Sequence, residues 1–239
     1  MQNWNLFVGM FLISSPILFA MIAFPDSIAW SWNEGRGGYF FALVFVIAEL
    51  IGLKIIISKK RLLAIAPIAL LTISYLVSLE YGLREFLIES ATQFNVQLIY
   101  SWTWMWDFIV MAIFIVIGLT IFFGKRWIRI APAAPIFLSG TAIILSLDAF
   151  FPYDTLGPLQ YIVPYFVQAN VWIITALDLG TAIARDNIMF LRGDHGSMAL
   201  QVFWPSAGVH SIIIFSLVIG AFMLKMNIMR SRKIGYFIY

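Results

Sequence analysis

The stretch TWMWDFIVMAIFIVIGLTIFF, residues 103–123, holds one charged residue, Asp107, in 21 positions. An α-helix rises about 1.5 Å per residue, so a helix of this length matches the hydrocarbon core of a bilayer, which is about 30 Å thick. Trp102, Trp104 and Trp106 gather at its beginning, as is typical of the membrane–water interface. The stretch therefore predicts a transmembrane helix, with Asp107 at headgroup depth.

Other apolar stretches extend this prediction to a polytopic, all-α membrane protein. Five have a similar length: 6–24, 38–57, 62–79, 130–147 and 205–226. A seventh, 159–183, makes the expected total six to seven transmembrane helices, and 234–239 (IGYFIY) resembles the beginning of a further span of a longer protein. The composition agrees, because 62% of the 239 residues are hydrophobic and 11% are charged, against about 25% charged residues in soluble domains. A lipid bilayer is thus the first expected partner.

Metal and thiol chemistry have little support in the sequence. Cysteine is absent, which excludes disulfides, thiolate metal ligands and a cysteine nucleophile. The two histidines, His195 and His210, are too few for a histidine-rich metal site. We expect no metal, no cofactor and no nucleic-acid partner.

The basic residues predict the orientation in the cell membrane. Four follow the second expected span, three follow the fourth and four follow the last, which makes eleven of the 15 Lys and Arg residues. Cytoplasmic loops are enriched in Lys and Arg, so the clusters at 59–61, 125–129 and 230–233 are expected in the cytoplasm. The remaining four, Arg36, Arg84, Arg185 and Arg192, are assigned to the loops on the other side, which carry many acids and then face out.

This orientation restricts the stretch 159–183. The fifth span ends outside and the last must begin outside, so everything from about 148 to 204 stays outside or dips into the membrane and returns. Pro158, Pro164, Gln168 and Asp178 also suit an interfacial or re-entrant helix better than a lipid-facing span. The alternative is that 159–183 crosses fully and the charge rule fails here.

Two short apolar runs follow this stretch. Ile188 to Leu191 and Leu200 to Phe203 flank the sequence Gly193-Asp194-His195-Gly196. Glycine and aspartate between apolar runs are typical of a tight turn, so we predict a small β-hairpin on the outer surface, with His195 exposed in its turn.

The segment Trp204-Pro205-Ser206-Ala207-Gly208-Val209-His210-Ser211 is the strongest candidate for chemistry. Proline suits the first turn of a helix, and small residues allow close backbone approach. Ser206 would lie where free N–H groups and the helix dipole favour developing negative charge, as a nucleophile and an oxyanion require. His210, four residues later, would share its face and is the second candidate catalytic residue, which could orient or deprotonate Ser206. The alternative is ordinary capping and hydrogen bonding between helices.

From Leu159 to Tyr239 the chain resembles the exosortase/archaeosortase family of membrane transpeptidases, and most of all its thaumarchaeal branch. In that family an outer helix leads through a Gly-x-x-[Ile/Val] turn and a short apolar hairpin to a Cys-[Ser/Ala/Thr]-Gly-[Ile/Val]-x-Ser motif. The matching residues here are Leu159-Gln160, Gly180-Thr181-Ala182-Ile183, Asn187-Ile188-Met189-Phe190 and Ser206-Ala207-Gly208-Val209-His210-Ser211. The match covers the last third of a single membrane domain, 1–239, which divides into a helical bundle (1–147) and the archaeosortase-like segment (148–239).

The resemblance implies an enzyme that cleaves C-terminal sorting signals of exported proteins through an acyl-enzyme and often transfers the new end to a lipid acceptor. It implies Ser206 as the catalytic residue, while the family position of His210 is variable. Two features depart from the family: Ser206 stands where the family has its cysteine, and an Asn-x-x-Arg motif would fall beyond Tyr239. A serine variant, an engineered knock-out and a non-catalytic relative all fit this pattern, because serine is the weaker nucleophile.

Four other charged residues lie in or beside the expected spans and hairpin: Glu49, Asp107, Arg185 and Arg192. Glu49 is an acid within an expected span, and such an acid is either functional or paired with another helix. Arg185 and Arg192 flank the hairpin and could bind a carboxylate or a lipid phosphate, or be solvated. Besides the transpeptidase, the sequence fits a non-catalytic scaffold subunit of a larger complex and, less well, a transporter.

Overall fold

The computed structural model describes residues 2–29, 34–151, 158–193, 196–204 and 209–225. The chain divides into two compact units, each considered by itself. Unit 1 comprises Met1–Ala149 and Ile214–Tyr239, and unit 2 comprises Phe150–Ile213.

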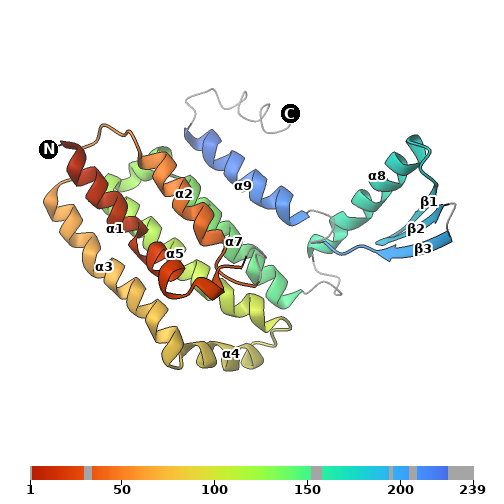
Figure 1. Cartoon of the computed structure of the whole chain (residues 1–239), viewed down its shortest axis with the longest axis horizontal. Helices are drawn as coiled ribbons and strands as arrows, with labels where there is room; N and C mark the ends of the chain where they lie inside the picture. Colours follow the sequence, from red (N-terminus) through yellow and green to blue (C-terminus); the bar gives the residue numbers. More distant parts are fainter. Residues whose placement is uncertain (1, 30–33, 152–157, 194–195, 205–208, 226–239) are drawn as a thin grey trace. The chain divides into compact units, whose positions relative to one another are not determined.

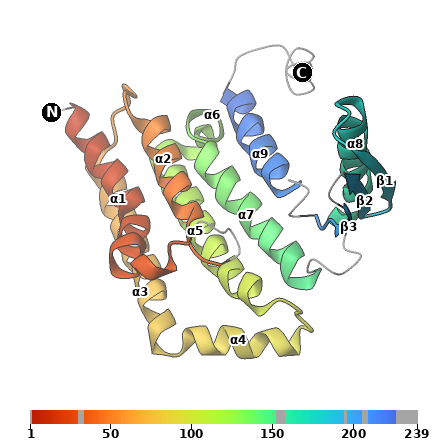
Figure 2. The ribbon, with the colours of Figure 1, turned by 45° about the vertical axis from the view of Figure 1, so that its right-hand side comes forward.

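Unit 1 is built from apolar helices, drawn in Figure 1: α1 (Gln2–Ala23), α2 (Gly38–Leu50), α3 (Lys59–Ser78), α4 (Leu83–Gln93), α5 (Ile99–Phe123), α6 (Trp127–Ile130), α7 (Ala133–Phe150) and most of α9 (Val209–Lys225). Helices α1, α2, α3, α5 and α7 lie side by side, and α4 runs across one end of them (Figures 1 and 2). The sequence did not predict α4, because its polar face leaves no long apolar run.

Within the described residues, four helical stretches are long and apolar enough to cross a membrane: Trp4–Ala23, Lys59–Tyr81, Ile99–Ile130 and Ala133–Phe150. They correspond to four of the expected spans. The apolar helices Gly38–Leu50 and Phe215–Lys225 are shorter. The expected six to seven full-length transmembrane helices are therefore not confirmed. The structure does confirm a mostly helical architecture with long apolar helices of the membrane type.

The second expected span, 38–57, is helical only in its first part. Helix α2 has 13 residues, about 20 Å at 1.5 Å per residue. It ends where Ile51 adopts an extended conformation and Gly52 a φ of +79°, which a residue with a side chain rarely adopts. Beyond this turn, an extended segment of β-branched residues leads to α3. A hydropathy pattern cannot distinguish such a segment from the rest of a span, because both are apolar.

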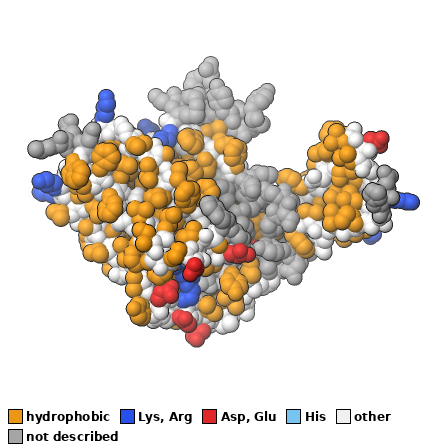
Figure 3. Space-filling view, viewed as in Figure 1, with side chains coloured by type: hydrophobic (Ala, Val, Ile, Leu, Met, Phe, Trp, Pro, Cys, Tyr) orange, Lys and Arg blue, Asp and Glu red, His pale blue; other side chains and the backbone are white. Residues whose placement is uncertain are grey.

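Charge separates the two ends of unit 1. At one end, here called the basic end, lie the beginning of α3, the short helix η3 (Gly124–Arg126) after α5 and the end of α9, which carry Lys59, Arg126 and Lys225. Arg61 joins α3 to the end of α5 by donating from Nη1 to the Phe122 carbonyl at 2.6 Å. The opposite end, here called the acidic end, includes α4 and exposes Glu85 and Glu89. Figure 3 shows acidic side chains gathered at this end and basic ones at the other.

Unit 2 packs one helix against a small sheet. The short helix η4 (Pro158–Ile162) precedes α8 (Val163–Ala176), and β1 (Thr181–Arg185), β2 (Ile188–Gly193) and β3 (Gly196–Gln201) form an antiparallel sheet in the order β1-β2-β3. Val163, Val167 and Val171 recur every four residues and are buried. They form the stripe by which α8 packs within its unit, mainly against β1.

The sheet corrects two details of the sequence prediction. It is a three-stranded meander, because β1 takes residues that were expected to continue the helix of 159–183. The helix instead stops at Ala176, and Asp178 and Gly180, both with positive φ, turn the chain into the strand. With 14 residues, α8 is about 21 Å long, which is less than the hydrocarbon core. That this stretch does not cross the bilayer remains a prediction.

Candidate functional site

Ser206 lies outside the described residues, together with Pro205 and with His195. His210 is the second residue of α9, and its side chain is also outside the described part. The predicted Ser206–His210 geometry is therefore untested. The chain is described up to Trp204, two residues before Ser206, and hydrogen bonds hold this part in place.

A single glutamine fixes this segment. The Gln160 side chain donates from Nε2 to the Val202 carbonyl at 3.3 Å and accepts at Oε1 from the Trp204 backbone N–H at 3.0 Å. Gln160 and Trp204 are both buried, and the Val202 N–H donates to the Asn187 carbonyl at 2.7 Å. The Gln160 amide thus provides a donor for the Val202 carbonyl and an acceptor for the Trp204 N–H, two backbone groups that lie beyond the end of β3. We call this arrangement the Gln160 clamp.

The sheet places Arg185 and Arg192 on one face. Arg185 pairs with Ile188 and Thr181 with Arg192, so alternation along the strands puts both arginines on the face that also carries Ile183 and Phe190. The side chains of both arginines, of Ile183 and of Phe190 are exposed. The face therefore combines an apolar centre with a cation toward each end, which is suited to an amphiphilic or extended peptide partner.

Strand β3 forms one edge of the sheet and is exposed over its whole length. An edge strand offers unpaired N–H and C=O groups to another chain. Its last residue, Gln201, lies five positions before Ser206. A peptide that paired with β3 would therefore be held close in sequence to the predicted nucleophile.

Unit 1 holds a separate polar centre around Asp107, which is completely buried. Its Oδ2 accepts from Arg36 Nε at 2.8 Å and Arg84 Nη2 at 3.3 Å, and its Oδ1 accepts from the Tyr75 hydroxyl at 3.0 Å. The Tyr39 hydroxyl donates to its backbone carbonyl at 2.8 Å. The residues come from α2, its preceding turn, α3, α4 and α5, so this Asp107 cluster joins four helices at the acidic end.

The turn before α2 positions Arg36. Its backbone N–H donates to the Ser27 carbonyl at 2.6 Å, and its Nη1 donates to the Ser27 hydroxyl at 2.9 Å. Gly35 is needed there, because a Cβ would collide with the same Ser27 carbonyl. The guanidinium also lies 5.3 Å from the ring centroids of Phe24 and Trp104, a cation–π geometry that helps to offset desolvation.

The Asp107 cluster has the features of a structural network. Two guanidinium groups and a tyrosine hydroxyl occupy one carboxylate, which leaves Asp107 no free role as a base. Nη2 of Arg36 and Nη1 of Arg84 are buried without a partner among the described residues. The described residues contain no group of three or more His, Cys, Asp or Glu side chains that could hold a metal.

Sequence reasoning missed this cluster in two respects. Asp107 was expected at headgroup depth, and Arg36 and Arg84 were assigned to loops. The available signal was that Asp107 is the only charged residue of its span, which implies a buried cationic partner. The identity of that partner depends on tertiary contacts.

Glu49 is also paired. Its Oε2 accepts from the backbone N–H of Ala133 at 2.9 Å and its Oε1 from Lys225 Nζ at 3.1 Å. Ala133 begins α7, where backbone N–H groups are free and a negative charge is favourable. Glu49 therefore joins α2, α7 and α9 at the basic end. Of the two interpretations of this acid, the structure supports pairing with other helices.

A third buried acid, Asp148, accepts a hydrogen bond from the Ser101 hydroxyl and so connects α7 with α5. Its other oxygen, Oδ1, has no partner among the described residues. Two backbone N–H groups, of Gln97 and Leu98, bind the neighbouring Ala149 carbonyl at 3.0 Å each. These contacts fix the loop before α5 onto the end of α7.

Comparisons with known proteins add no relative: no family model, no curated protein and no solved structure matches the chain.

Proposed function

We propose that the protein is a sortase-like membrane transpeptidase that processes C-terminal sorting signals of exported proteins, with Ser206 as its nucleophile. The observation that carries the proposal is the Gln160 clamp. Gln160 and Ser206 belong to separate parts of the archaeosortase-like pattern, and Gln160 binds the backbone of Trp204, two residues before Ser206. Catalytic groups must be held within fractions of an ångström, and buried supporting hydrogen bonds provide this.

The proposed reaction begins when Ser206 Oγ attacks the scissile carbonyl of the signal. A C–O ester bond forms, the peptide C–N bond breaks, and the serine proton passes through His210 to the departing amine. An amine or hydroxyl of a lipid acceptor, or water, then attacks the ester and releases Ser206. The first helical turn, where the sequence predicts Ser206 to lie, would supply N–H donors for the oxyanion.

The substrate site that we propose is the open face and edge of the unit 2 sheet. The extended signal would pair with β3, in the manner of strand addition. Arg185 and Arg192 would bind a terminal carboxylate or the acceptor's phosphate, because guanidinium groups form paired hydrogen bonds with both.

The proposal includes six membrane crossings. The second would consist of α2 and the extended segment after it, and the last of α9. Lysine and arginine enrichment supports a cytoplasmic basic end, which would put the acidic end and Ser206 outside, where exported substrates arrive.

The test is processing of candidate sorting-signal substrates by the full-length gene product, followed by the mass of the new C-terminus. Ser206→Ala should abolish processing, and Ser206→Cys should retain or raise it, because a thiolate is the better nucleophile. Gln160→Leu should lower the rate with normal expression. Ser216→Ala, in α9, serves as the control and should have no effect.

The second candidate is a non-catalytic scaffold, and the Asp107 cluster is the observation that favours it, since the best-built polar site described has only structural contacts. If the wild-type protein and the Ser206→Ala and Ser206→Cys variants all fail to process any candidate substrate, the transpeptidase proposal is wrong and the scaffold stands.

A further inference from the structure

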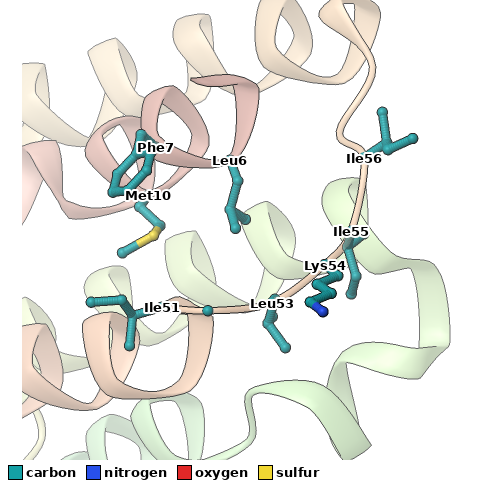
Figure 4. A pocket seen from close by; sticks show the side chains of 9 residues that line it. Leu6, Phe7, Met10, Ile51, Leu53, Lys54, Ile55 and Ile56 are labelled. Atoms are coloured by element: carbon teal, nitrogen blue, oxygen red, sulfur yellow. The ribbon is translucent and has the colours of Figure 1, made fainter. Parts of the chain in front are cut away.

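A cavity of about 480 Å³ lies beside α1 near the basic end of unit 1. One wall consists of Leu6, Phe7 and Met10 of α1, and the rest comes from residues 51–56, which form the turn after α2 and the extended segment that follows it (Figure 4). Its size is within the range of about 300–1,000 Å³ that is typical of small-ligand sites.

Contacts at both ends of the extended segment hold this cavity open. At the α2 end, the Leu53 N–H donates to the Leu50 carbonyl at 3.3 Å, which closes the turn around Gly52. At the α3 end, the Asn5 side-chain amide donates to the Ile57 carbonyl at 2.9 Å, and Ile57 is completely buried. The segment between these contacts is therefore fixed beside α1.

The lining combines apolar walls with one cation. Every lining side chain is hydrophobic except that of Lys54, and Gly52 has none. Lys54 is exposed and has no ion pair among the described residues. Glu49, the acid on the helix that leads into the segment, is occupied by Lys225 and the Ala133 N–H. The charge of Lys54 is thus free for an external anion.

The backbone of the segment adds free donors. Among the described residues, the N–H groups of Lys54, Ile55 and Ile56 have no hydrogen-bond acceptor. In a membrane such groups must find a partner, because an unsatisfied backbone group in hydrocarbon costs several kcal/mol. In an extended segment the N–H groups of Lys54 and Ile56 project to one side and that of Ile55 to the other. Free N–H groups beside a lysine are a favourable environment for phosphate oxygens.

We propose that this cavity binds one phospholipid with an anionic headgroup. Its phosphate binds the Lys54 side chain and free N–H groups on one side of the segment, and an acyl chain lies against Leu6, Phe7, Met10 and Ile51. A free phosphate ion would leave the apolar walls unfilled, and a neutral lipid would leave the surplus charge of Lys54 unpaired. Phe7 and Ile51, exposed by more than half, continue the apolar surface outward from the cavity.

Native mass spectrometry and thermal unfolding in detergent test the proposal, with phosphatidylglycerol and phosphatidylcholine as probes. Phosphatidylglycerol should remain bound and raise the melting temperature more than phosphatidylcholine. Lys54→Gln should weaken phosphatidylglycerol binding by about fivefold, the contribution of one basic residue near anionic lipid. Lys125→Gln is the matched control, because Lys125 lies in the turn after α5 and does not line the cavity.

A second variant tests the contacts of the lipid's acyl chain separately from those of its headgroup. Leu6→Trp would fill the cavity and should reduce the retention of both lipids, while binding of inorganic phosphate alone should be undetectable in every form. Equal binding of the two lipids, an equal loss in Lys125→Gln, or stabilisation by phosphate alone as strong as by phosphatidylglycerol would each overturn the proposal. Because the assay requires no catalysis, its outcome is independent of the proposed transpeptidase.

Discussion

Arg36 Nε donates a 2.8 Å hydrogen bond to Asp107 Oδ2, although 71 residues separate them and neither side chain reaches solvent. A charge buried in this way is costly unless its partner is present, and removal of one member leaves the other uncompensated. The pair therefore determines how the beginning of α2 and the beginning of α5 are held together.

Asp107→Ala should lower the free energy of unfolding by about 3–5 kcal/mol, because Arg36 would remain buried without a counter-ion. Thermal or denaturant unfolding of the detergent-solubilised protein measures the change. Glu89→Gln is the control: Glu89 is exposed on α4 at the same end, so its removal should leave stability within about 0.5 kcal/mol of the wild type.

The double variant Arg36→Met with Asp107→Leu should recover much of this loss. Two apolar side chains replace the buried pair without leaving a charge, and such replacements are often neutral. Arg84, which is 18% exposed, can turn its guanidinium toward water. If the loss of stability in the double variant equals the sum of the losses in the Arg36→Met and Asp107→Leu single variants, the pair is not coupled.

Gly38→Ala should destabilise the protein by about 1–3 kcal/mol, the usual cost of overpacking. A Cβ at Gly38 would lie 2.8 Å and 2.9 Å from two ring carbons of Phe108, which is buried and cannot withdraw. The matched control is Gly220→Ala in α9, where a Cβ meets nothing within 4 Å. This change should be neutral or stabilising by up to about 1 kcal/mol, since alanine is the better helix former. Equal effects of the two changes would contradict the packing argument.

The sequence predicted the long helices well, because a helix that faces lipid is apolar along its whole length. The stretch 62–79 corresponds to α3 and 103–123 to α5. The sequence prediction failed at 38–57, where Gly52 ends the helix but apolar residues continue on both sides of it. Nothing in hydropathy marks that point, since isoleucine and leucine suit an extended segment and a membrane helix equally.

The site was predicted less completely, for a different reason. Ser206 and Gln160 each carried a local signal, and the hydrogen bond from the Trp204 N–H to Gln160 is a tertiary contact that no spacing rule could give. Arg36 and Arg84 were placed in loops, because an arginine is normally solvated. Their burial depends on Asp107, which is distant in sequence from both.

Lys225→Met should lower stability and loosen α9, because Lys225 balances the buried charge of Glu49. The expected loss is about 1–3 kcal/mol, less than for Asp107→Ala, since Lys225 is 30% exposed and the Ala133 N–H continues to bind Glu49. Proteolysis after Lys and Arg near the end of α9 should also become faster. Lys125→Met, a change of the same kind at the same end, is the control, and an identical loss there would point to net charge and not to the pair.

Orientation can be measured directly, because the sequence has no cysteine and any introduced thiol is unique. Lys60 lies in the first turn of α3, and Glu85 lies in α4 at the opposite end of unit 1; both are exposed or partly exposed. Positive-inside enrichment predicts that Lys60→Cys faces the cytoplasm and Glu85→Cys the outside. In intact cells a membrane-impermeant maleimide should label only the cysteine at position 85, whereas both should react after permeabilisation with detergent. Labelling of position 60 alone would show that the protein has the opposite orientation in the membrane. Labelling of both positions in sealed cells would mean that α3 does not cross the bilayer. The first result would place Ser206 on the cytoplasmic side, away from exported substrates, and would remove the topological basis of the proposed transpeptidase.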